Sequence, residues 1–121
     1  MTKMTGNPTD RYLPLKPVVL HILLALAESE SHGYGVIQLV RERSEGHIQL
    51  QTGPFYRHLK KLMDHGLVEE SAARPAGDDP RRGAYYAITP LGKDVVAAEA
   101  RRLATLVAMT QDLGLTGGKK P

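Results

Sequence analysis

The chain has 121 residues, of which 41% are hydrophobic and 24% are charged, a balance typical of one soluble globular domain. Sixteen lysines and arginines against thirteen acidic residues give a formal charge of +3, which permits nucleic-acid binding without requiring it. The sequence contains no cysteine, and this excludes disulfides, cysteine-ligated zinc fingers and thiol catalysis.

The sequence offers no candidate for a membrane-spanning helix. Its longest apolar run, residues 18–27, is interrupted by His21 and covers about half of the roughly 20 residues that such a helix needs. The opening MTKMTGNPTD lacks the basic-then-apolar order of a secretory signal. We therefore expect a cytoplasmic protein without a membrane partner.

The first predicted helix begins at Pro14 and Pro17 and ends near Ala27. Its central sequence, VVLHILLALA, is apolar on almost every side, whereas a helix that covers one face of a small core has a polar outer face. Because this helix needs cover on two sides, we expect a second subunit to contact it. The candidate contact residues are Leu20, Leu23 and Leu24.

A second helix is predicted from Tyr34 to about Glu45, after the break ESESHG. Val36, Ile37 and Val40 recur at helical spacing and are expected to face the core, while charged residues between them face solvent. This helix would precede the one that carries the functional surface.

Residues 52–66, TGPFYRHLKKLMDHG, predict a third, amphipathic helix. Its buried stripe consists of four apolar residues, namely Phe55, Leu59, Leu62 and Met63. Either Thr52 or Gly53 can cap its start. Pro54 suits the first turn, where a missing N–H removes no helical bond, and Gly66 can end the helix in the left-handed conformation.

The outer face of this third helix carries Arg57, Lys60 and Lys61, with Tyr56 at its border. Together with the free N–H groups at the helix start, such a face can lie against a phosphate-lined groove. The same pattern also suits an ordinary solvated helix. Tyr56 could equally be a half-buried side chain that braces the helix.

Two strands separated by a polar loop predict a β-hairpin after the third helix. The first strand lies in the sequence LVEESAA, which follows Gly66. The second lies in residues 84–89, where alternation places Tyr86 and Ile88 on one face and Tyr85 and Ala87 on the other.

The loop between these strands, residues 74–83, contains turn-forming and charged residues and predicts no regular structure. Its cations are Arg74, Arg81 and Arg82. Asp78 and Asp79 offset part of this charge, and the sequence leaves open whether they point away or pair with the arginines.

The last predicted helix starts with Thr89 as its cap and Pro90 at its first position, and it runs to about Leu113. Its apolar positions approximate a seven-residue repeat and include Val96, Leu103, Leu106, Val107, Thr110 and Leu113. Such a repeat indicates helix pairing between two subunits. The alternative is a helix that folds back on its own domain.

Three helices followed by a hairpin predict a mainly α fold with a small β-hairpin, the winged helix-turn-helix. In this fold the third helix enters a major groove, and the hairpin tip, the wing, contacts the backbone or the minor groove. We divide the chain into a flexible N-terminal tail (1–12), a winged helix-turn-helix DNA-binding domain (13–89), a C-terminal dimerisation helix (90–114) and a disordered tail (115–121).

The motifs HGYGVIQLV, GPFYRHLKKLMDHGLVEE and RRGAYYAITPLGKDVV, in this order, resemble the PadR family of bacterial transcriptional regulators. The resemblance covers residues 13–113 and is most specific in the third helix combined with His32, Gly33 and Tyr34. It implies a homodimeric repressor that binds double-stranded DNA at a pseudo-palindromic operator. Larger members of the family carry a longer dimerisation domain, so the resemblance implies nothing about a ligand of this shorter chain.

The resemblance also implies a set of DNA-contacting residues. Tyr56 would be a phosphate-contacting or groove-edge residue, with the cations of the third helix beside it. The candidates are Thr52, Gly53, Pro54, Tyr56, Arg57, Lys60, Lys61, Arg74, Arg81 and Arg82.

The residues also exclude several kinds of chemical site. His58 and His65 lie about 10 Å apart along one helix, too far to share a metal ion, and the other histidines have no acidic neighbour at ligand spacing. No phosphate-binding loop, nucleophile elbow or spaced carboxylate pair occurs. Gly33 and Gly35 are better explained by backbone packing. We expect no metal, no cofactor and no enzymatic activity.

Two other functions stay open at this point. The winged helix could bind a protein, with its basic face as ordinary surface. Alternatively, the regulator could sense a small-molecule effector in an apolar cavity between the first and last helices of a dimer. One Phe and no Trp offer few rings for stacking on a planar drug, which argues against a multidrug pocket.

Overall fold

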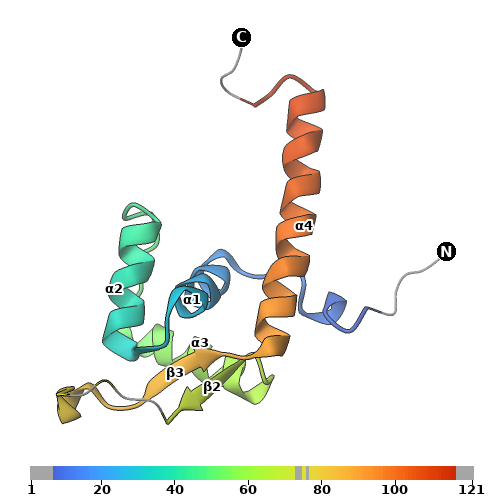
Figure 1. Cartoon of the computed structure of the whole chain (residues 1–121). Coiled ribbons are helices and arrows are strands. Elements are labelled where there is room, and N and C mark those ends of the chain that lie inside the picture. The colour runs from blue at the N-terminus through green and yellow to red at the C-terminus, as the bar shows by residue number, and fades with distance from the viewer. Residues whose placement is uncertain (1–6, 73–74, 76, 117–121) are drawn as a thin grey trace.

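The computed structural model describes residues 7–72, 75 and 77–116. Its helices and strands are α1 (Pro17–Glu28), β1 (Ser31–His32), α2 (Gly33–Arg43), α3 (Thr52–Asp64), β2 (Val68–Ser71), β3 (Tyr85–Ile88) and α4 (Pro90–Asp112), with two short 3-10 turns, η1 (Asp10–Tyr12) and η2 (Pro80–Arg82). Figure 1 shows α1 at the centre, α2 and the lower part of α4 on its two sides, and α3 with the strands beneath. The winged helix-turn-helix fold predicted from the sequence is confirmed.

The apolar character of α1 results from its central place in the fold. The helix contacts α2, α4 and β3, so its own chain covers several of its sides. Leu23 is fully buried in this core, which corrects the prediction that it lies at a subunit surface. Its neighbour Leu24 is 45% exposed, and Leu20 is half-buried.

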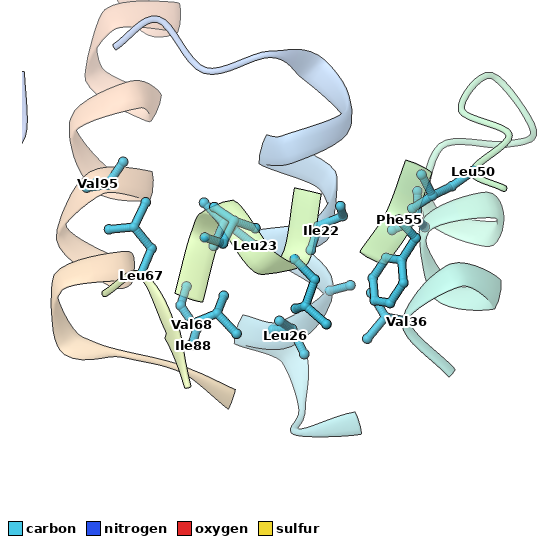
Figure 2. Close-up of a cluster of buried hydrophobic side chains, with 14 residues drawn as sticks. Ile22, Leu23, Leu26, Val36, Leu50, Phe55, Leu67, Val68, Ile88 and Val95 are labelled. Carbon is cyan, nitrogen blue, oxygen red and sulfur yellow. The ribbon is translucent and has the colours of Figure 1, made fainter. Parts of the chain in front are cut away.

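The core continues from α4 across α1 to α2, as Figure 2 shows. At one end Val95 lies near Leu67, and at the other Phe55 lies near Val36. Phe55 is fully buried, so the predicted stripe of α3 forms the floor of this core. Met63 was expected in the same stripe but is 36% exposed, because it lies at the edge of the apolar face.

The sheet has three antiparallel strands in the order β1-β3-β2. The predicted hairpin forms with Val68 opposite Ile88. The additional strand β1 pairs Ser31 with Tyr86 and was not predicted, because two residues are too few to show alternation. Tyr85 and Ile88 are the most buried residues of β3, because the Tyr85 hydroxyl bonds to Asp78 of the wing loop and Ile88 lies in the core. Tyr86 packs against the same core as Ile88, in agreement with the predicted alternation.

The junction between the sheet and α4 is tightly packed. Thr89 accepts a hydrogen bond from the N–H of Gly92 (3.0 Å) and donates one to the carbonyl of Gly66 (2.6 Å), so the predicted cap is confirmed. A Cβ at Gly92 would lie 2.3 Å from the carbonyl oxygen of Leu67. Only glycine therefore allows α4 to lie this close to the end of α3 and the start of β2.

The C-terminal end of α3 agrees with the sequence prediction, whereas the cap at its start differs from it. Gly66 has a φ of 77°, and the N–H of Leu67 reaches the carbonyl of Leu62 (2.9 Å), as a left-handed helix end requires. At the start, Gln51 is the cap and makes no side-chain cap bond, which corrects the prediction of Thr52 or Gly53. Both of those residues belong to the first helical turn.

The described part of the expected N-terminal tail, residues 7–12, is folded. The side chain of Asn7 accepts a hydrogen bond from the N–H of Thr9 (3.0 Å), and Thr9 is buried. Further along, the N–H of Leu15 donates to Glu99 of α4 (2.9 Å), a buried carboxylate that also pairs with Arg102. Leu15 and Glu99 are far apart in the sequence, so no local sequence pattern predicts their contact.

The far half of α4 stands clear of the other elements in Figure 1. Six large apolar side chains are exposed on it or just beyond it, namely Leu103, Leu106, Val107, Met109, Leu113 and Leu115. Across the described residues, every helix is too short or too polar to span a membrane. Nor do three potential metal ligands of the His, Asp or Glu type gather anywhere in that same part of the chain.

Candidate nucleic-acid interface

The outer face of α3 presents three cations to solvent. Lys60 makes an exposed ion pair with Asp64 (3.4 Å), a kind of contact that contributes little stability. No ion pair between described residues includes Arg57 or Lys61. Both side chains are exposed and are therefore available to a polyanion.

The start of α3 leaves its first N–H groups without a side-chain cap. Thr52 and Gly53 are exposed, and Pro54 has no N–H, so their backbone meets solvent at the positive end of the helix dipole. A Cβ at Gly53 would contact only Arg57, at 3.7 Å. This helix end can therefore approach a phosphate closely.

Tyr56 occupies the border that the sequence indicates, and it is 45% exposed. Its ring lies edge-on to Phe55, with centroids 4.9 Å apart. A Cβ at Gly33 would lie 2.4 Å from its hydroxyl oxygen, so the ring packs directly against the first residue of α2. Tyr56 thus braces α3 against α2 and still exposes nearly half of its side-chain surface.

Two glycines at the start of α2 allow this packing. The Nδ1 atom of His32 accepts the N–H of Gly35 (3.2 Å) and so caps the helix. A Cβ at Gly35 would lie 2.2 Å from the hydroxyl oxygen of Ser31. The prediction that Gly33 and Gly35 serve backbone packing is confirmed by these close contacts.

A hollow of about 540 Å³, here called the wing-side hollow, joins α2, α3 and the wing. It is lined by His32, Tyr34, Gln38, Tyr56, Asp79, Arg81 and Arg82. Figure 1 shows the wing turn η2 extending beneath the start of α2. The fold therefore brings Tyr56 together with two of the predicted wing arginines, while Arg74 lies outside the described residues.

Four residues of the wing-side hollow were not among the predicted contacts, namely His32, Tyr34, Gln38 and Asp79. His32 belongs to β1 and caps α2, Tyr34 and Gln38 lie on α2, and the Gln38 amide donates to the hydroxyl of Tyr34 (3.1 Å). The HGY motif includes His32 and Tyr34, and Gln38 lies further along the same sequence HGYGVIQLV. Their convergence on the wing depends on tertiary packing, which the motif does not reveal.

The wing arginines are paired within the wing itself. Arg81 makes a forked contact with Asp79, including a bond of 2.9 Å from Nη2, and Asp79 also accepts the N–H of Arg81. Hydrogen bonding to the Arg81 side chain holds the pKa of Asp79 below its usual value. The two aspartates were predicted either to point away or to pair, and Asp79 pairs.

The second wing pair is more buried. The Asp78 side chain is 1% exposed and accepts hydrogen bonds from Arg82 (3.0 Å) and from the Tyr85 hydroxyl (2.7 Å). Hydrogen bonding to Tyr85 and Asp78 raises the pKa of Arg82. The described wing tip therefore carries two cations and two anions in contact, which agrees with the expectation that Asp78 and Asp79 offset part of its charge.

The predicted subunit contacts fall into two groups. Leu103, Leu106, Val107 and Leu113 are exposed on the free half of α4 or at its end. Thr110 is exposed beside them, and its hydroxyl donates to the carbonyl of Val107 (2.7 Å). Val96 is half-buried and packs against the core.

Solved structures with the same fold are transcriptional regulators. One from Clostridium thermocellum superposes with a TM-score of 0.65 at 18% identity, covering 91% of this chain and 97% of its own. A PadR family transcription regulator from Clostridium difficile gives 0.66 at 21% identity, covering 81% and 98%. A PadR-like transcription factor from Bacteroides fragilis gives 0.63 at 18% identity, covering 79% and 88%. At these identities the likeness establishes the fold alone.

Family membership comes from the sequence itself. The model of the transcriptional regulator PadR-like family matches residues 22–98, which is more than half of the chain. No curated protein sequence matches it. The matched region contains α2, α3 and the wing, where the wing-side hollow lies. The chain belongs to the PadR-like family of transcriptional regulators.

Proposed function

We propose that this regulator is a repressor that binds a pseudo-palindromic operator as a homodimer, through α3 and the wing. The observation that carries the proposal is the surface of α3. Its start has no side-chain cap, its outer face exposes Arg57 and Lys61 without ion pairs among the described residues, and the wing-side hollow lies along one flank.

In this proposal α3 lies in the major groove with its first turn closest to the bases. The N–H groups of Thr52 and Gly53 and the cations Arg57, Lys60 and Lys61 replace counterions along the phosphates. Tyr56 contacts the backbone from the edge of the groove. The Arg81 guanidinium already bonds to the Asp79 carboxylate. To contact a phosphate, it exchanges this carboxylate for the phosphate.

The homodimer forms through the free half of α4. An exposed apolar strip on a helix that stands clear of its own domain needs cover, and a second α4 offers an identical strip. Leu24 and Leu20 of α1 add to the contact. A two-fold axis would then present two α3 helices to successive major grooves, about 34 Å apart.

A fluorescence-anisotropy titration tests the proposal. The duplexes are an operator selected from random sequences and a scrambled control, each at two salt concentrations. We expect saturation at two chains per duplex and a preference on the order of a thousandfold for the selected sequence. Arg57→Ala should weaken binding, whereas Arg101→Ala, which changes an exposed arginine on α4, should not.

The dimer has its own test. Leu106→Glu places a charge in the proposed apolar contact and should lower the molar mass measured by light scattering toward that of one chain. Weak binding that is equal for both duplexes and disappears with salt would contradict sequence-specific regulation. An unchanged mass for Leu106→Glu would contradict the assignment of α4.

A further inference from the structure

A second hollow lies on the opposite flank of α3 from the wing. It measures about 470 Å³ and is bounded by the segment before α1 and by the second half of α3. Its basic lining residues are Arg11, Lys16, His58, Lys61 and His65, and its lining includes no Asp or Glu side chain. The remaining lining is mostly apolar. We call it the N-terminal hollow.

Burial and the neighbouring positive charges both disfavour protonation of His58 at this hollow. Partial burial, followed by the charges of Lys16, Lys61 and Arg57, lowers the pKa of His58. These are the charged groups that act on it from the segment before α1 and from α3, and Arg11 and His65 line the same hollow. Unlike the wing-side hollow, whose lining includes Asp79, this hollow is lined by cations and by no acidic side chain of the described residues.

The cations of the N-terminal segment are held in place by contacts within the protein. The Arg11 guanidinium donates to the Tyr12 hydroxyl (2.7 Å) and lies 4.9 Å from the centre of that ring. The Tyr12 ring packs edge-on against His65 at 5.7 Å. The bond from Leu15 to Glu99 ties the same segment to α4. Arg11 and Lys16 are therefore presented by a folded segment beside α3.

The two hollows match the two walls of a DNA groove. A major groove is about 12 Å wide and is bounded by a phosphate backbone on each side. Tyr56 and His58 are two residues apart on a helix, so their side chains point to opposite flanks of α3. A helix that lies in the groove presents the wing-side hollow to one backbone and the N-terminal hollow to the other.

We propose that the N-terminal hollow binds a backbone phosphate of the operator on the groove edge opposite the wing, through Arg11, Lys16 and Lys61. This inference rests on the proposed DNA-binding function. The absence of acidic lining residues favours an anion, and the position beside α3 favours the anion that borders a groove. His58 takes up a proton when the phosphate binds, because an adjacent negative charge stabilises the imidazolium.

Ethylation interference on the selected operator tests the proposal directly, since it reports each phosphate that the protein needs. Wild type should require two groups of phosphates in each half-site. The double variant Arg11→Ala/Lys16→Ala should lose the group distant from the wing and keep the other. Arg81→Ala should show the opposite pattern, and Arg101→Ala should keep both.

The salt dependence gives a second, quantitative readout. Each phosphate contact that is lost should lower the slope of log affinity against log salt by about 1. The double variant should show this reduction with an unchanged molar mass and melting temperature. Wild type should bind DNA more tightly at about pH 6 than at about pH 8, and His58→Gln should still bind DNA but lose part of this rise in affinity.

The outcomes separate this inference from the proposed function. If the double variant keeps all phosphates and the wild-type slope while Arg57→Ala weakens binding, the N-terminal hollow is not a DNA site and the proposed function stands. If wild type requires no phosphate in any duplex, both fail. If the double variant leaves DNA contacts intact but abolishes calorimetric binding of benzoate, the hollow takes a small organic anion instead.

Discussion

The two flanks of α3 both carry arginines, but these arginines differ in their partners. On the wing side, Arg81 and Arg82 contact Asp79 and Asp78 within a few residues of chain. On the N-terminal side, Arg11 and Lys16 line a hollow that contains no acidic side chain. The difference shows that the number of cations on an element does not predict its electrostatic field, because nearby carboxylates can neutralise those cations. The wing presents paired charges, whereas the lining of the N-terminal hollow presents cations without an acidic side chain.

The largest expected effect comes from removing the anchor of the N-terminal flank. Glu99→Ala deletes a buried carboxylate that accepts the N–H of Leu15 and pairs with Arg102. The free energy of unfolding should fall by about 2–4 kcal/mol, because the N–H of Leu15 loses its acceptor and the partly exposed Arg102 loses its partner. Urea denaturation measures this value.

Glu99→Gln is the conservative control, since it keeps an acceptor for Leu15 and should cost less. Arg101→Ala, on the neighbouring exposed position, should be close to neutral. Equal stability of Glu99→Ala and wild type would mean that the N-terminal segment is not held by α4.

A smaller effect is expected on the wing side from Gly33→Ala. The added Cβ would lie 2.4 Å from the Tyr56 hydroxyl oxygen and must displace that ring from the wing-side hollow. We expect the affinity for the operator to fall by about 1–2 kcal/mol, comparable to one lost contact. Anisotropy titration measures the loss.

Tyr56→Phe provides the matching control, because it removes the atom that would clash. Gly33→Ala should also lower the free energy of unfolding because of this clash, and in the double variant Gly33→Ala/Tyr56→Phe part of that loss should return. Strictly additive effects in this double-mutant cycle would show that the two residues do not interact.

Charge pairing in the wing predicts a gain of function. Asp79→Asn keeps an acceptor for the N–H of Arg81 but removes the charge that occupies its guanidinium. Binding to any duplex should strengthen at low salt, and the slope against log salt should steepen by up to about 1.

The exposed pair of Glu28 and Arg43, between α1 and α2, supplies the control for this variant. Glu28→Gln releases an arginine outside both hollows and should leave the salt slope unchanged. A slope that does not respond to Asp79→Asn would mean that Arg81 does not reach the phosphates.

The smallest expected effect is the pH dependence that His58 gives to the free energy of unfolding and, in the opposite direction, to DNA affinity. Its pKa is lowered in the folded chain, so the unfolded chain holds more protons just below about pH 6.5. The free energy of unfolding should therefore decrease as the pH falls through this range and level off below the folded pKa. His58→Gln should flatten that decrease.

DNA affinity should change in the opposite direction, strengthening as the pH falls, because a bound phosphate favours the protonated ring. Thermal melts and titrations over the same pH series compare the two trends. Parallel trends would contradict a phosphate near His58.

The sequence predicts features that depend on local periodicity. The apolar stripe of α3 and its cationic outer face follow from spacing alone, and Thr89 and Pro90 mark the start of α4. Burial within an apolar helix is harder to predict. Leu23 and Leu24 are adjacent leucines, and only the positions of α2, α4 and the sheet decide that one is buried and the other exposed.

Features that depend on distant contacts could not be predicted. Leu15 and Glu99 meet across most of the chain length, and a lone glutamate in a helix normally indicates a solvated surface. For the same reason the folded segment of residues 7–12 was expected to be a tail. Likewise, the sequence places Arg81 next to Asp79, but only the geometry of η2 shows that they pair.

The packing of Gly92 has a consequence for how the regulator could switch. Because Gly92 packs against the Leu67 carbonyl and the Thr89 cap bonds to the carbonyl of Gly66, we expect α4 to move together with the winged helix as one rigid body. In the proposed dimer, the spacing of the two α3 helices then depends on the angle at which the α4 helices cross. A rotation of about 10° at the subunit contact, along a helix of about 35 Å, shifts the winged-helix end of α4 by about 6 Å, close to two base-pair steps. A modest change at the subunit contact would suffice to bring both half-sites out of register.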